Sequence, residues 1–290
     1  MEYTTLNTGA KMPYLGLGVF QLADLAECER VVDEALAVGY RLIDTAQGYG
    51  NERAVGKAIR AAGLPRAELF VTTKVWVANN SYEGAKASIG RSLERLGLDY
   101  LDLLLIHHPF SDYYGAYRAL QEAFHAGTLR AIGVSNFYPD HLADLVAFNE
   151  VVPAVNQVET HVFCQQRAAK AQMEALGVQI EAWAPFAEGR DGFFGNPTLA
   201  AVGAKYAKTP AQVALRFLIQ SGVVVIPKTA HPARLAENFA VFDFALDADD
   251  LAAISALDTG QRLLMNHYDP ATVQRFKRLV EERKDNPEIN

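Results

Sequence analysis

The chain has 290 residues, of which 50% are hydrophobic and 21% are charged. This composition supports a packed globular core and excludes a disordered or collagen-like chain. The 27 Lys and Arg against 34 Asp and Glu give a net charge of −7, so no overall electrostatic attraction to nucleic acid or to an anionic membrane surface is expected. A local basic pocket for a phosphate is compatible with this charge.

The cysteines and the apolar runs indicate where the protein resides. The two cysteines, Cys28 and Cys164, provide neither a disulfide framework nor metal-ligand spacing, which fits a reducing compartment. The N-terminus has no basic region followed by an apolar run, so no signal peptide is expected. The longest apolar runs, such as Val223–Pro227, are far shorter than the about 20 residues that span a membrane. We therefore expect a cytoplasmic protein without membrane partners.

Short β-rich runs alternate with longer segments of helical periodicity along most of the chain. The predicted strands, in chain order, are Leu15–Phe20, Tyr40–Asp44, Leu69–Lys74, Leu101–His107, Ala131–Ser135, Ala154–Gln157, Gln179–Trp183 and Val223–Lys228. The predicted helices are Asp24–Val38, Glu52–Ala62, Tyr82–Leu96, Tyr114–Ala126, Pro139–Phe148, Gln165–Ala175, Pro210–Gln220 and, in the tail, Pro270–Arg283. Eight strand-helix units without a break in composition predict one domain over residues 1–290.

The character of the strands favours a closed (β/α)8 barrel, that is, a TIM barrel of α/β class. Leu101–Ile106 and Val223–Ile226 are apolar nearly throughout, as strands covered on both faces are. A doubly wound parallel sheet is the alternative. An N-terminal β-hairpin, Tyr3–Thr5 with Lys11–Pro13, is expected to cap the bottom of the barrel.

Polar side chains at the carboxyl ends of barrel strands face the active site of such a fold. The second, third and fourth predicted strands end in Asp44, Lys74 and His107, and Tyr49 follows Asp44 in a glycine-flanked loop. Each residue alone has an ordinary structural explanation: a helix cap, a solvated charge, a core histidine and a loop aromatic. A buried ammonium is costly unless it is paired, however, and Asp44 on the adjacent strand is the available partner of Lys74.

These four residues have a coherent chemical use. A phenol is a weak acid with a pKa near ~10, and a nearby ammonium lowers that pKa. Asp44 would keep Lys74 charged, and the pair would tune Tyr49 as a proton donor to a carbonyl oxygen that His107 orients. Because no Ser or Cys nucleophile is apparent, an external hydride is the natural attacking group.

The chain resembles the aldo-keto reductases over nearly its whole length. The matching motifs, in the order of that family, are 42–52 (LIDTAQGYGNE), 73–76 (TKVW), 105–109 (LIHHP), 133–137 (GVSNF), 156–159 (NQVE), 182–186 (AWAPF) and 226–229 (IPKT). The family's catalytic Asp, Tyr, Lys and His correspond to Asp44, Tyr49, Lys74 and His107. We refer to these four residues as the tetrad.

The resemblance implies NADPH as the hydride source, although neither a Gly-x-Gly-x-x-Gly fingerprint nor a P-loop is present. It implies that Ser135, Asn136 and Gln157 hydrogen-bond the nicotinamide carboxamide, and that Trp183 stacks on the ring where the family usually has Tyr. It also includes Asp44 among the cofactor contacts. The remaining cofactor contacts that it implies are Pro185, Phe186, Lys228, Thr229 and Arg234, with Glu237 and Asn238 at the adenine. The cations Lys228 and Arg234 and the hydroxyl of Thr229 suit the 2′-phosphate and favour NADPH over NADH. Without the family motif, Lys228 and Arg234 would be interpreted as ordinary surface charges.

The substrate side is expected to be aromatic. Its implied residues are Phe20, Tyr49, Trp76, His107 and His108, with Phe110 as either a lining or a core residue. His108 stands where many relatives have Trp, and the pair His107-His108 lacks a third residue spaced to complete a metal site. The tail, 259–290, is expected to border the pocket, and it resembles tails of bacterial members that reduce small aldehydes, dicarbonyls or keto-sugars.

Two other functions compete with carbonyl reduction. A strand-end lysine in a barrel can form a Schiff base, so Lys74 could serve an aldolase if it were unpaired and partly deprotonated. A non-catalytic NADPH-binding or regulatory protein could share the same fold, although a pure binding protein has no need of Tyr49. For the reductase, the expected partner is a small-molecule carbonyl substrate, and a monomer or weak dimer is expected.

Overall fold

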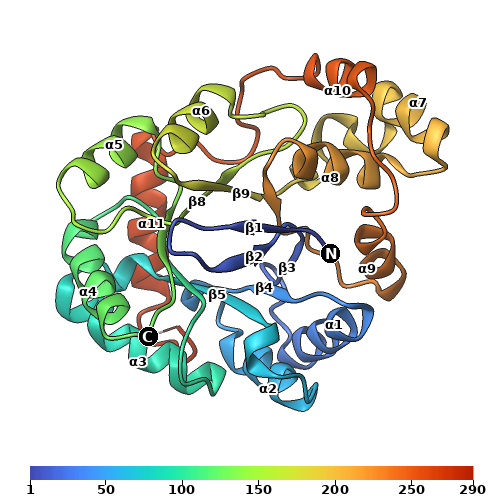
Figure 1. Ribbon diagram of the computed structural model, residues 1–290. Helices are drawn as coiled ribbons and strands as arrows, with labels where there is room; N and C mark the ends of the chain where they lie inside the picture. The colour runs from blue at the N-terminus through green and yellow to red at the C-terminus, as the bar shows by residue number, and fades with distance from the viewer. Residues whose placement is uncertain (290) are drawn as a thin grey trace.

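The computed structural model describes residues 1–289 and contains a parallel eight-stranded barrel surrounded by helices (Figure 1). The barrel strands are β3 (Gly16–Gly18), β4 (Leu42–Asp44), β5 (Phe70–Val75), β6 (Leu103–Ile106), β7 (Ile132–Ser135), β8 (Val155–Glu159), β9 (Gln179–Trp183) and β10 (Val224–Val225). Each strand pairs in parallel with the next along the chain. A parallel bridge between Leu15 and Val225 closes the ring. The predicted (β/α)8 barrel is confirmed, and the doubly wound sheet is excluded.

The helices form the outer layer. They are α1 (Leu25–Val38), α2 (Glu52–Ala61), α3 (Tyr82–Leu96), α4 (Tyr113–His125), α5 (Pro139–Ala147), α6 (Arg167–Ala175), α7 (Pro197–Tyr206), α8 (Pro210–Gln220), α9 (Pro232–Phe239), α10 (Ala248–Ser255) and α11 (Pro270–Glu282). Short 3-10 segments are η1 (Gln47–Tyr49), η2 (Arg66–Glu68), η3 (Val77–Asn79) and η4 (Ala187–Gly195). Eight of these helices lie within two residues of their predicted bounds, whereas α7, α9 and α10 were not predicted.

Local sequence signals explain why the helices begin and end where they do. Ser81 accepts a hydrogen bond from the Gly84 amide at the start of α3, and Gly97 ends that helix with a φ of 65°. Thr209 and Gln212 cap α8 reciprocally, and Pro210 occupies its first turn. These signals set the lengths of the helices between strands, so the strand ends are brought together at one face of the barrel.

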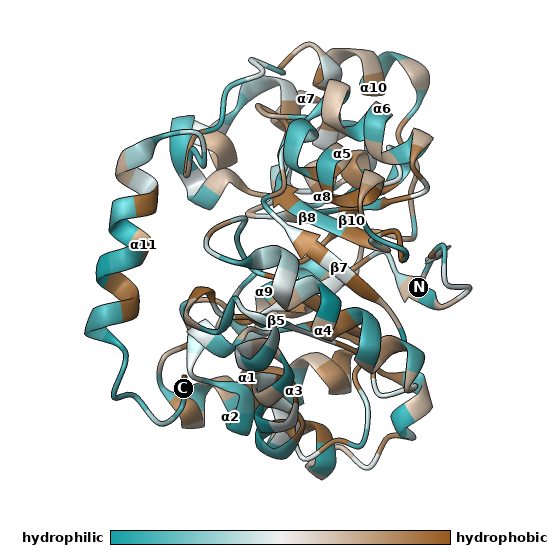
Figure 2. Ribbon diagram, turned by 90° about the vertical axis from the view of Figure 1, so that its left-hand side faces the viewer, coloured by the Kyte–Doolittle hydropathy of each residue, from teal (hydrophilic) through white to brown (hydrophobic). Residues whose placement is uncertain are grey.

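The two ends of the barrel are covered by different parts of the chain. The antiparallel hairpin of β1 (Tyr3–Thr5) and β2 (Lys11–Pro13) lies across one end, as predicted. The tail helix α11 stands at the opposite side of the molecule from the N-terminus, with apolar and polar residues along it (Figure 2). Within residues 1–289, no helix is long and apolar enough to cross a membrane.

The barrel interior changes from apolar to polar along its axis. Inward-facing side chains such as Leu42, Leu103 and Val155 pack with Met12 of the hairpin. Alternate residues on the same strands, such as Ile43 and Leu104, face outward and pack against the helices. Toward the carboxyl ends of the strands the buried inward positions become polar: Asp44, Lys74, Gln157 and Glu181. Polar residues buried at this level require partners, and the partners define a site.

Candidate active site

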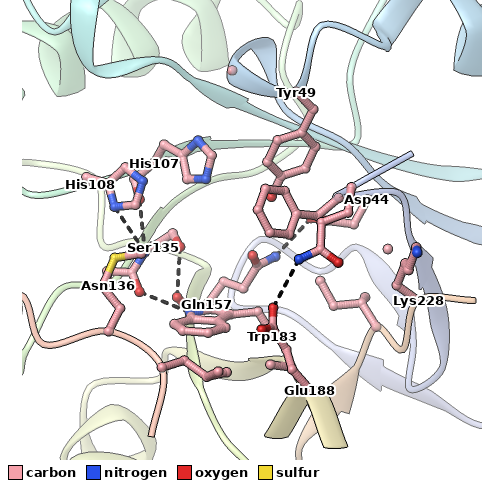
Figure 3. A pocket seen from close by; sticks show the side chains of 18 of the residues that line it. Asp44, Tyr49, His107, His108, Ser135, Asn136, Gln157, Trp183, Glu188 and Lys228 are labelled. Atoms are coloured by element: carbon pink, nitrogen blue, oxygen red, sulfur yellow. Dashed lines mark hydrogen bonds between the residues drawn. The ribbon is translucent and has the colours of Figure 1, made fainter. Parts of the chain in front are cut away.

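A cavity of about 670 Å³ opens at the carboxyl ends of the strands. The residues predicted from the sequence that line it are Phe20, Asp44, Tyr49, Trp76, His107, His108, Ser135, Asn136, Gln157, Trp183, Pro185, Phe186 and Lys228. Figure 3 shows their arrangement, with His107 and His108 at one end of the pocket and Lys228 at the other. Lys74 lies directly beneath, fully buried.

Three members of the tetrad are joined by hydrogen bonds. The Lys74 ammonium donates to Asp44 Oδ1 at 2.5 Å and to the Thr45 carbonyl at 3.1 Å, and it lies 3.3 Å from the Tyr49 hydroxyl. Asp44 ends β4, Lys74 lies on the adjacent strand β5, and Tyr49 ends η1 in the loop after β4. Burial alone would lower the pKa of Lys74, but the neighbouring Asp44 carboxylate more than offsets that effect and raises it. The ammonium therefore stays charged.

The ionisation of Tyr49 differs from the expectation. The sequence predicted a pKa lowered by the ammonium, whereas burial raises the pKa of Tyr49 above its ordinary value and Lys74 only limits the rise. Burial in the barrel mouth was not visible in the sequence. A phenol in this environment is fully protonated at neutral pH, which is the state that a proton donor requires.

His107 faces the same cavity as Tyr49. The two rings meet edge to face with centroids 5.6 Å apart. Burial, together with the charge of Lys74, lowers the pKa of His107 well below its ordinary value, so the imidazole is neutral. Its Nδ1 atom has no hydrogen-bond partner in the part of the chain that the structure describes. A neutral imidazole with one N–H can donate to a substrate oxygen without contributing a charge.

Asn136 connects the histidine end of the pocket to Trp183. Its amide nitrogen donates to the His107 carbonyl at 3.1 Å and to Ser135 Oγ at 3.0 Å. Its oxygen accepts the indole N–H of Trp183 at 3.0 Å. Ser135 Oγ in turn donates to the Gln157 carbonyl. These bonds fix the indole at the cavity wall, where it presents a flat apolar face.

The side-chain amide of Gln157 has a defined orientation. Its nitrogen donates to Asp44 Oδ2 and to Glu181 Oε2, both at 2.9 Å. Because both hydrogens are used inside the barrel, the amide oxygen is the atom left for a ligand in the cavity. Glu181 was not predicted from the sequence, although a carboxyl group within an otherwise apolar strand, 180–183, was a signal for it.

The predicted phosphate-binding and adenine-binding residues are only partly in the cavity. Lys228 lines it, whereas Thr229, Arg234, Glu237 and Asn238 lie outside the cavity lining in the described structure, on the loop after Lys228 and on α9. The Thr229 hydroxyl accepts the His231 amide, and Glu237 accepts the Thr209 hydroxyl. In the sequence, these residues come after Lys228, which lines one end of the cavity.

The substrate end is formed by aromatic residues and the tail. Leu264, Met265, Phe276 and Leu279 line the cavity from the tail, together with Phe20 and Trp76. The rings of Trp76 and Phe276 pack against each other, with centroids 6.0 Å apart. Phe110 does not line it in the described structure; it packs behind, with ring centroids 5.9 Å from His108 and 5.4 Å from Phe276.

Two contacts that the sequence analysis did not predict hold the tail. Glu159, on β8, accepts the backbone amides of three consecutive tail residues, 263–265. His267 Nε2 lies 2.9 Å from His108 Nδ1. A third unpredicted contact crosses the pocket, from the Gln21 amide to Glu188 Oε1 at 3.4 Å. Sequence patterns on separate segments give no signal for such long-range pairs.

The described residues contain no group of three or more His, Cys, Asp or Glu arranged to hold a metal ion. The site is therefore built from an ion pair, a phenol, a neutral imidazole and a set of amides. Such an arrangement can protonate an oxygen atom and orient a flat, uncharged ring beside it.

Comparisons with known proteins show the family to which the chain belongs. The aldo/keto reductase family model matches residues 14–259. The chain is 45% identical over 261 residues to methylglyoxal reductase DkgA of Yersinia pestis, covering 89% of this chain and 93% of that protein. It superposes on a deep-sea metagenome aldo-keto reductase, MGS-M4, with a TM-score of 0.90 and 40% identity, over 92% and 98% of the two chains.

An aldo-keto reductase in complex with NADPH, AKR2E5, is also similar, with a TM-score of 0.85 and 34% identity over 90% of this chain and 89% of that one. The family model covers most of the chain, and the resemblance expected from the sequence motifs is confirmed. The chain is also 43% identical over 272 residues to morphine 6-dehydrogenase of Pseudomonas putida, covering 89% of this chain and 92% of that protein. The chain belongs to the aldo-keto reductase family.

Proposed function

We propose that this protein reduces aldehydes or ketones to alcohols with NADPH, and that its substrates are small aldehydes, dicarbonyls or keto-sugars. The observation that carries the proposal is the Lys74 ammonium, which contacts both Asp44 and the Tyr49 hydroxyl while His107 faces the same cavity. The similar protein named methylglyoxal reductase supports a small dicarbonyl as one substrate class.

The cavity suits NADPH at both ends. At one end, the free amide oxygen of Gln157 can accept from a carboxamide, and the Trp183 indole offers a flat face to a ring. At the other end, Lys228 lines the cavity, and Arg234 follows it in the sequence; both are cations that suit a phosphate. When bound, NADPH supplies a hydride to the carbonyl carbon. The similar structure in complex with NADPH supports this assignment.

The residues of this chain supply the proton and the orientation. The carbonyl oxygen sits between Tyr49 and the neutral His107, which donates a hydrogen bond to it. Tyr49 donates its phenolic proton as negative charge develops on that oxygen, and Lys74 stabilises the phenolate that remains. Asp44 keeps Lys74 charged and in place.

The geometry disfavours the two alternatives. A Schiff-base aldolase needs a neutral amine, whereas Lys74 is paired with Asp44 and its pKa is raised. A pure NADPH-binding protein does not require a protonated phenol beside an ammonium at the cavity wall. The arrangement of Tyr49 and Lys74 therefore favours catalysis.

We further propose that residues 1–290 act as one domain whose tail, 259–290, closes the substrate end. The tail residues Leu264, Met265 and Phe276 that line the cavity support this assignment. A cytoplasmic location is proposed as well, because Cys28 and Cys164 are both free and buried.

Substitution of Tyr49 by Phe tests the mechanism. The variant keeps the ring and removes the proton donor, so we expect kcat to fall by roughly 10²- to 10⁴-fold. The dissociation constant of NADPH, measured by quenching of tryptophan fluorescence, should change by less than about twofold. Turnover is measured from loss of NADPH absorbance with a panel of aldehydes, dicarbonyls and keto-sugars. A Tyr49→Phe enzyme with wild-type turnover would refute Tyr49 as the donor.

A further inference from the structure

Glu181 is a buried carboxyl group that the mechanism above does not use. It lies on β9, has no exposed surface, and precedes the cavity residue Trp183 by two positions, so both side chains point into the barrel. Its Oε2 atom accepts from the Gln157 amide, and its Oε1 atom has no partner among residues 1–289. A carboxylate in such a position would be an unpaired buried charge.

The charges that face Glu181 explain its protonation. Its electrostatic interactions are with three ionisable groups: Asp44 from β4, Lys74 from β5 and Tyr49 from η1. The neighbouring strand β10 has no ionisable residue, and Glu159 on β8 is engaged with the tail. The single ammonium is held directly by Asp44, so a second carboxylate at this level lacks a counter-ion of its own.

Burial, reinforced by the charge of Asp44, raises the pKa of Glu181 to about 8. Glu181 is therefore a neutral carboxylic acid at neutral pH, and it becomes an anion under mildly alkaline conditions. The Tyr49 and Lys74 pKa values are raised from ordinary values near ~10, so neither group titrates in the same range.

We propose that Glu181 is a positioning residue for the nicotinamide: as a neutral acid it holds the Gln157 amide with its oxygen toward the cavity, and as an anion it shifts cofactor preference toward the oxidised form. The inference rests on the proposed use of NADPH. Its support is geometric, because two of the residues expected to contact the nicotinamide, Gln157 and Trp183, adjoin Glu181.

The direction of the effect follows from the charge of the ligand. An oxidised nicotinamide ring is cationic, whereas the reduced ring is neutral, so a buried anion nearby favours the oxidised cofactor. By linkage, NADP⁺ must then promote loss of the Glu181 proton when it binds. The 2′-phosphate is common to both forms, so its own titration cancels in the ratio of their dissociation constants.

The experiment measures dissociation constants of NADP⁺ and NADPH from pH 6.5 to 9.5 by tryptophan fluorescence. For the wild type, we expect the ratio of the NADP⁺ constant to the NADPH constant to fall by at least about fivefold between pH 7 and 9. Glu181→Gln should make this ratio independent of pH. Glu52→Gln is the matched control. Glu52, on α2, is equally buried, but it accepts a hydrogen bond from Thr73 on β5 and none from Gln157. The ratio of the two dissociation constants in this variant should therefore follow the wild type.

The outcomes separate this inference from the proposed function. Binding of both cofactors with a flat wild-type ratio, or a Glu181→Gln ratio that still varies with pH, would overturn the role of Glu181 alone. Failure of the wild type to bind either cofactor would overturn both proposals. If Glu181→Gln does not fold, the wild type itself decides the question. Calorimetry of cofactor binding near pH 8, in buffers of different ionisation enthalpy, measures the protons released on binding. Binding of NADP⁺ should release more protons than binding of NADPH, and equal release would refute the inference.

Discussion

Lys74 shows how one residue sets the protonation of its neighbours. Its ammonium is fully buried, yet the Asp44 carboxylate at 2.5 Å keeps it charged. That charge limits the rise of the Tyr49 pKa and contributes to the lowered pKa of His107. The Lys74 ammonium therefore adds to the effect of burial in keeping the imidazole neutral, and it gives the phenol a nearby cation to stabilise its conjugate base.

Removal of the ammonium by Lys74→Met should cost stability as well as activity. Asp44 would be left as an unpaired buried carboxylate, and breaking a buried pair in this way costs about 3–5 kcal/mol. Burial would raise the folded-state pKa of Asp44 above its unfolded value, so the lost stability should return as the pH is lowered from 7 toward 4. Urea unfolding at several pH values measures both effects.

The double variant Asp44→Asn with Lys74→Met is the control. It removes both charges, so it should recover most of the stability that Lys74→Met loses while remaining inactive. Equal stability of the wild type and Lys74→Met at pH 7 would show that the pair is not buried as the structure describes.

The residues of the tetrad could be predicted because each ends or follows a strand with a clear apolar pattern. Asp44, Lys74 and His107 are polar where such strands end, which places them at one face of a barrel. The protonation of Tyr49 could not be predicted in the same way, since it depends on burial by segments that are distant in sequence. Glu181 was missed for a related reason: its partner Gln157 belongs to the preceding strand.

At the scale of elements, a carboxylate on the barrel is one of the contacts that hold the tail. Glu159 Oε1 accepts the Leu263 and Leu264 amides at 2.6 and 3.2 Å, and Oε2 accepts the Met265 amide at 3.3 Å. These bonds set where Leu264 and Met265 enter the cavity. Glu159 thus connects β8 to the wall of the substrate end.

Glu159→Gln should therefore loosen the tail without disturbing the cofactor end. Replacing a charged acceptor weakens these bonds by about 2 kcal/mol in total, so amide exchange at 263–265 should accelerate roughly 30-fold. The KM of carbonyl substrates should rise, whereas the NADPH dissociation constant should stay within about twofold. Glu174→Gln, at an exposed position on α6, is the control. Unchanged exchange at 263–265 in Glu159→Gln would contradict the anchoring role.

His267 makes the attachment of the tail dependent on pH. Burial, with the nearby charge of Arg262, lowers its pKa from an ordinary 6.5 to about 4. The docked tail then binds fewer protons than a released tail, so docking is fully stable above pH 6.5 and weakens as the pH falls toward 4. The contact between His267 and His108, 2.9 Å apart, is the one that protonation disturbs.

Acidification from pH 7 to 5 should therefore increase opening of residues 263–267 by about 20-fold, after correction of hydrogen exchange for its intrinsic pH dependence. His267→Phe should reduce this pH dependence. Glu159→Gln should retain it while exchanging faster at every pH, which separates the two contacts. A wild-type tail equally protected at pH 5 and 7 would refute the role of His267.

The elements themselves were predictable to different degrees. Strands and the larger helices follow from periodicity, and the predicted and observed bounds of α3 and α8 are the same. The helices α7, α9 and α10 interrupt the regular alternation, but Pro197 and Pro232 at first turns and the capping box of Asp247 with Asp250 were local signals for them.

For the whole molecule, the barrel depends on a narrow seam between its first and last strands. β10 has only two residues, and the Leu15–Val225 bridge joins it to the start of β3. Two backbone hydrogen bonds complete the seam: the Val225 amide donates to the Tyr14 carbonyl at 2.8 Å, and the Gly18 amide donates to the Pro227 carbonyl at 3.3 Å. A sequence with eight strand-like runs predicts closure but gives no indication of how closely these two strands approach.

Gly18 permits this approach. A Cβ atom at Gly18 would lie 2.8 Å from the Ile226 carbonyl oxygen, a backbone atom that cannot move aside without opening the seam. Gly18→Ala should therefore destabilise the protein by about 2 kcal/mol, as overpacking does, and lower the melting temperature.

Gly90→Ala is the matched control, because Gly90 is exposed within α3 and an added Cβ would meet no described atom within 4 Å. That substitution should stabilise the helix by about 1 kcal/mol. Both variants add the same methyl group, so opposite shifts of the melting temperature would show that Gly18→Ala loses its stability at the seam. A Gly18→Ala protein that melts at or above the wild-type temperature would show that the barrel is not closed there.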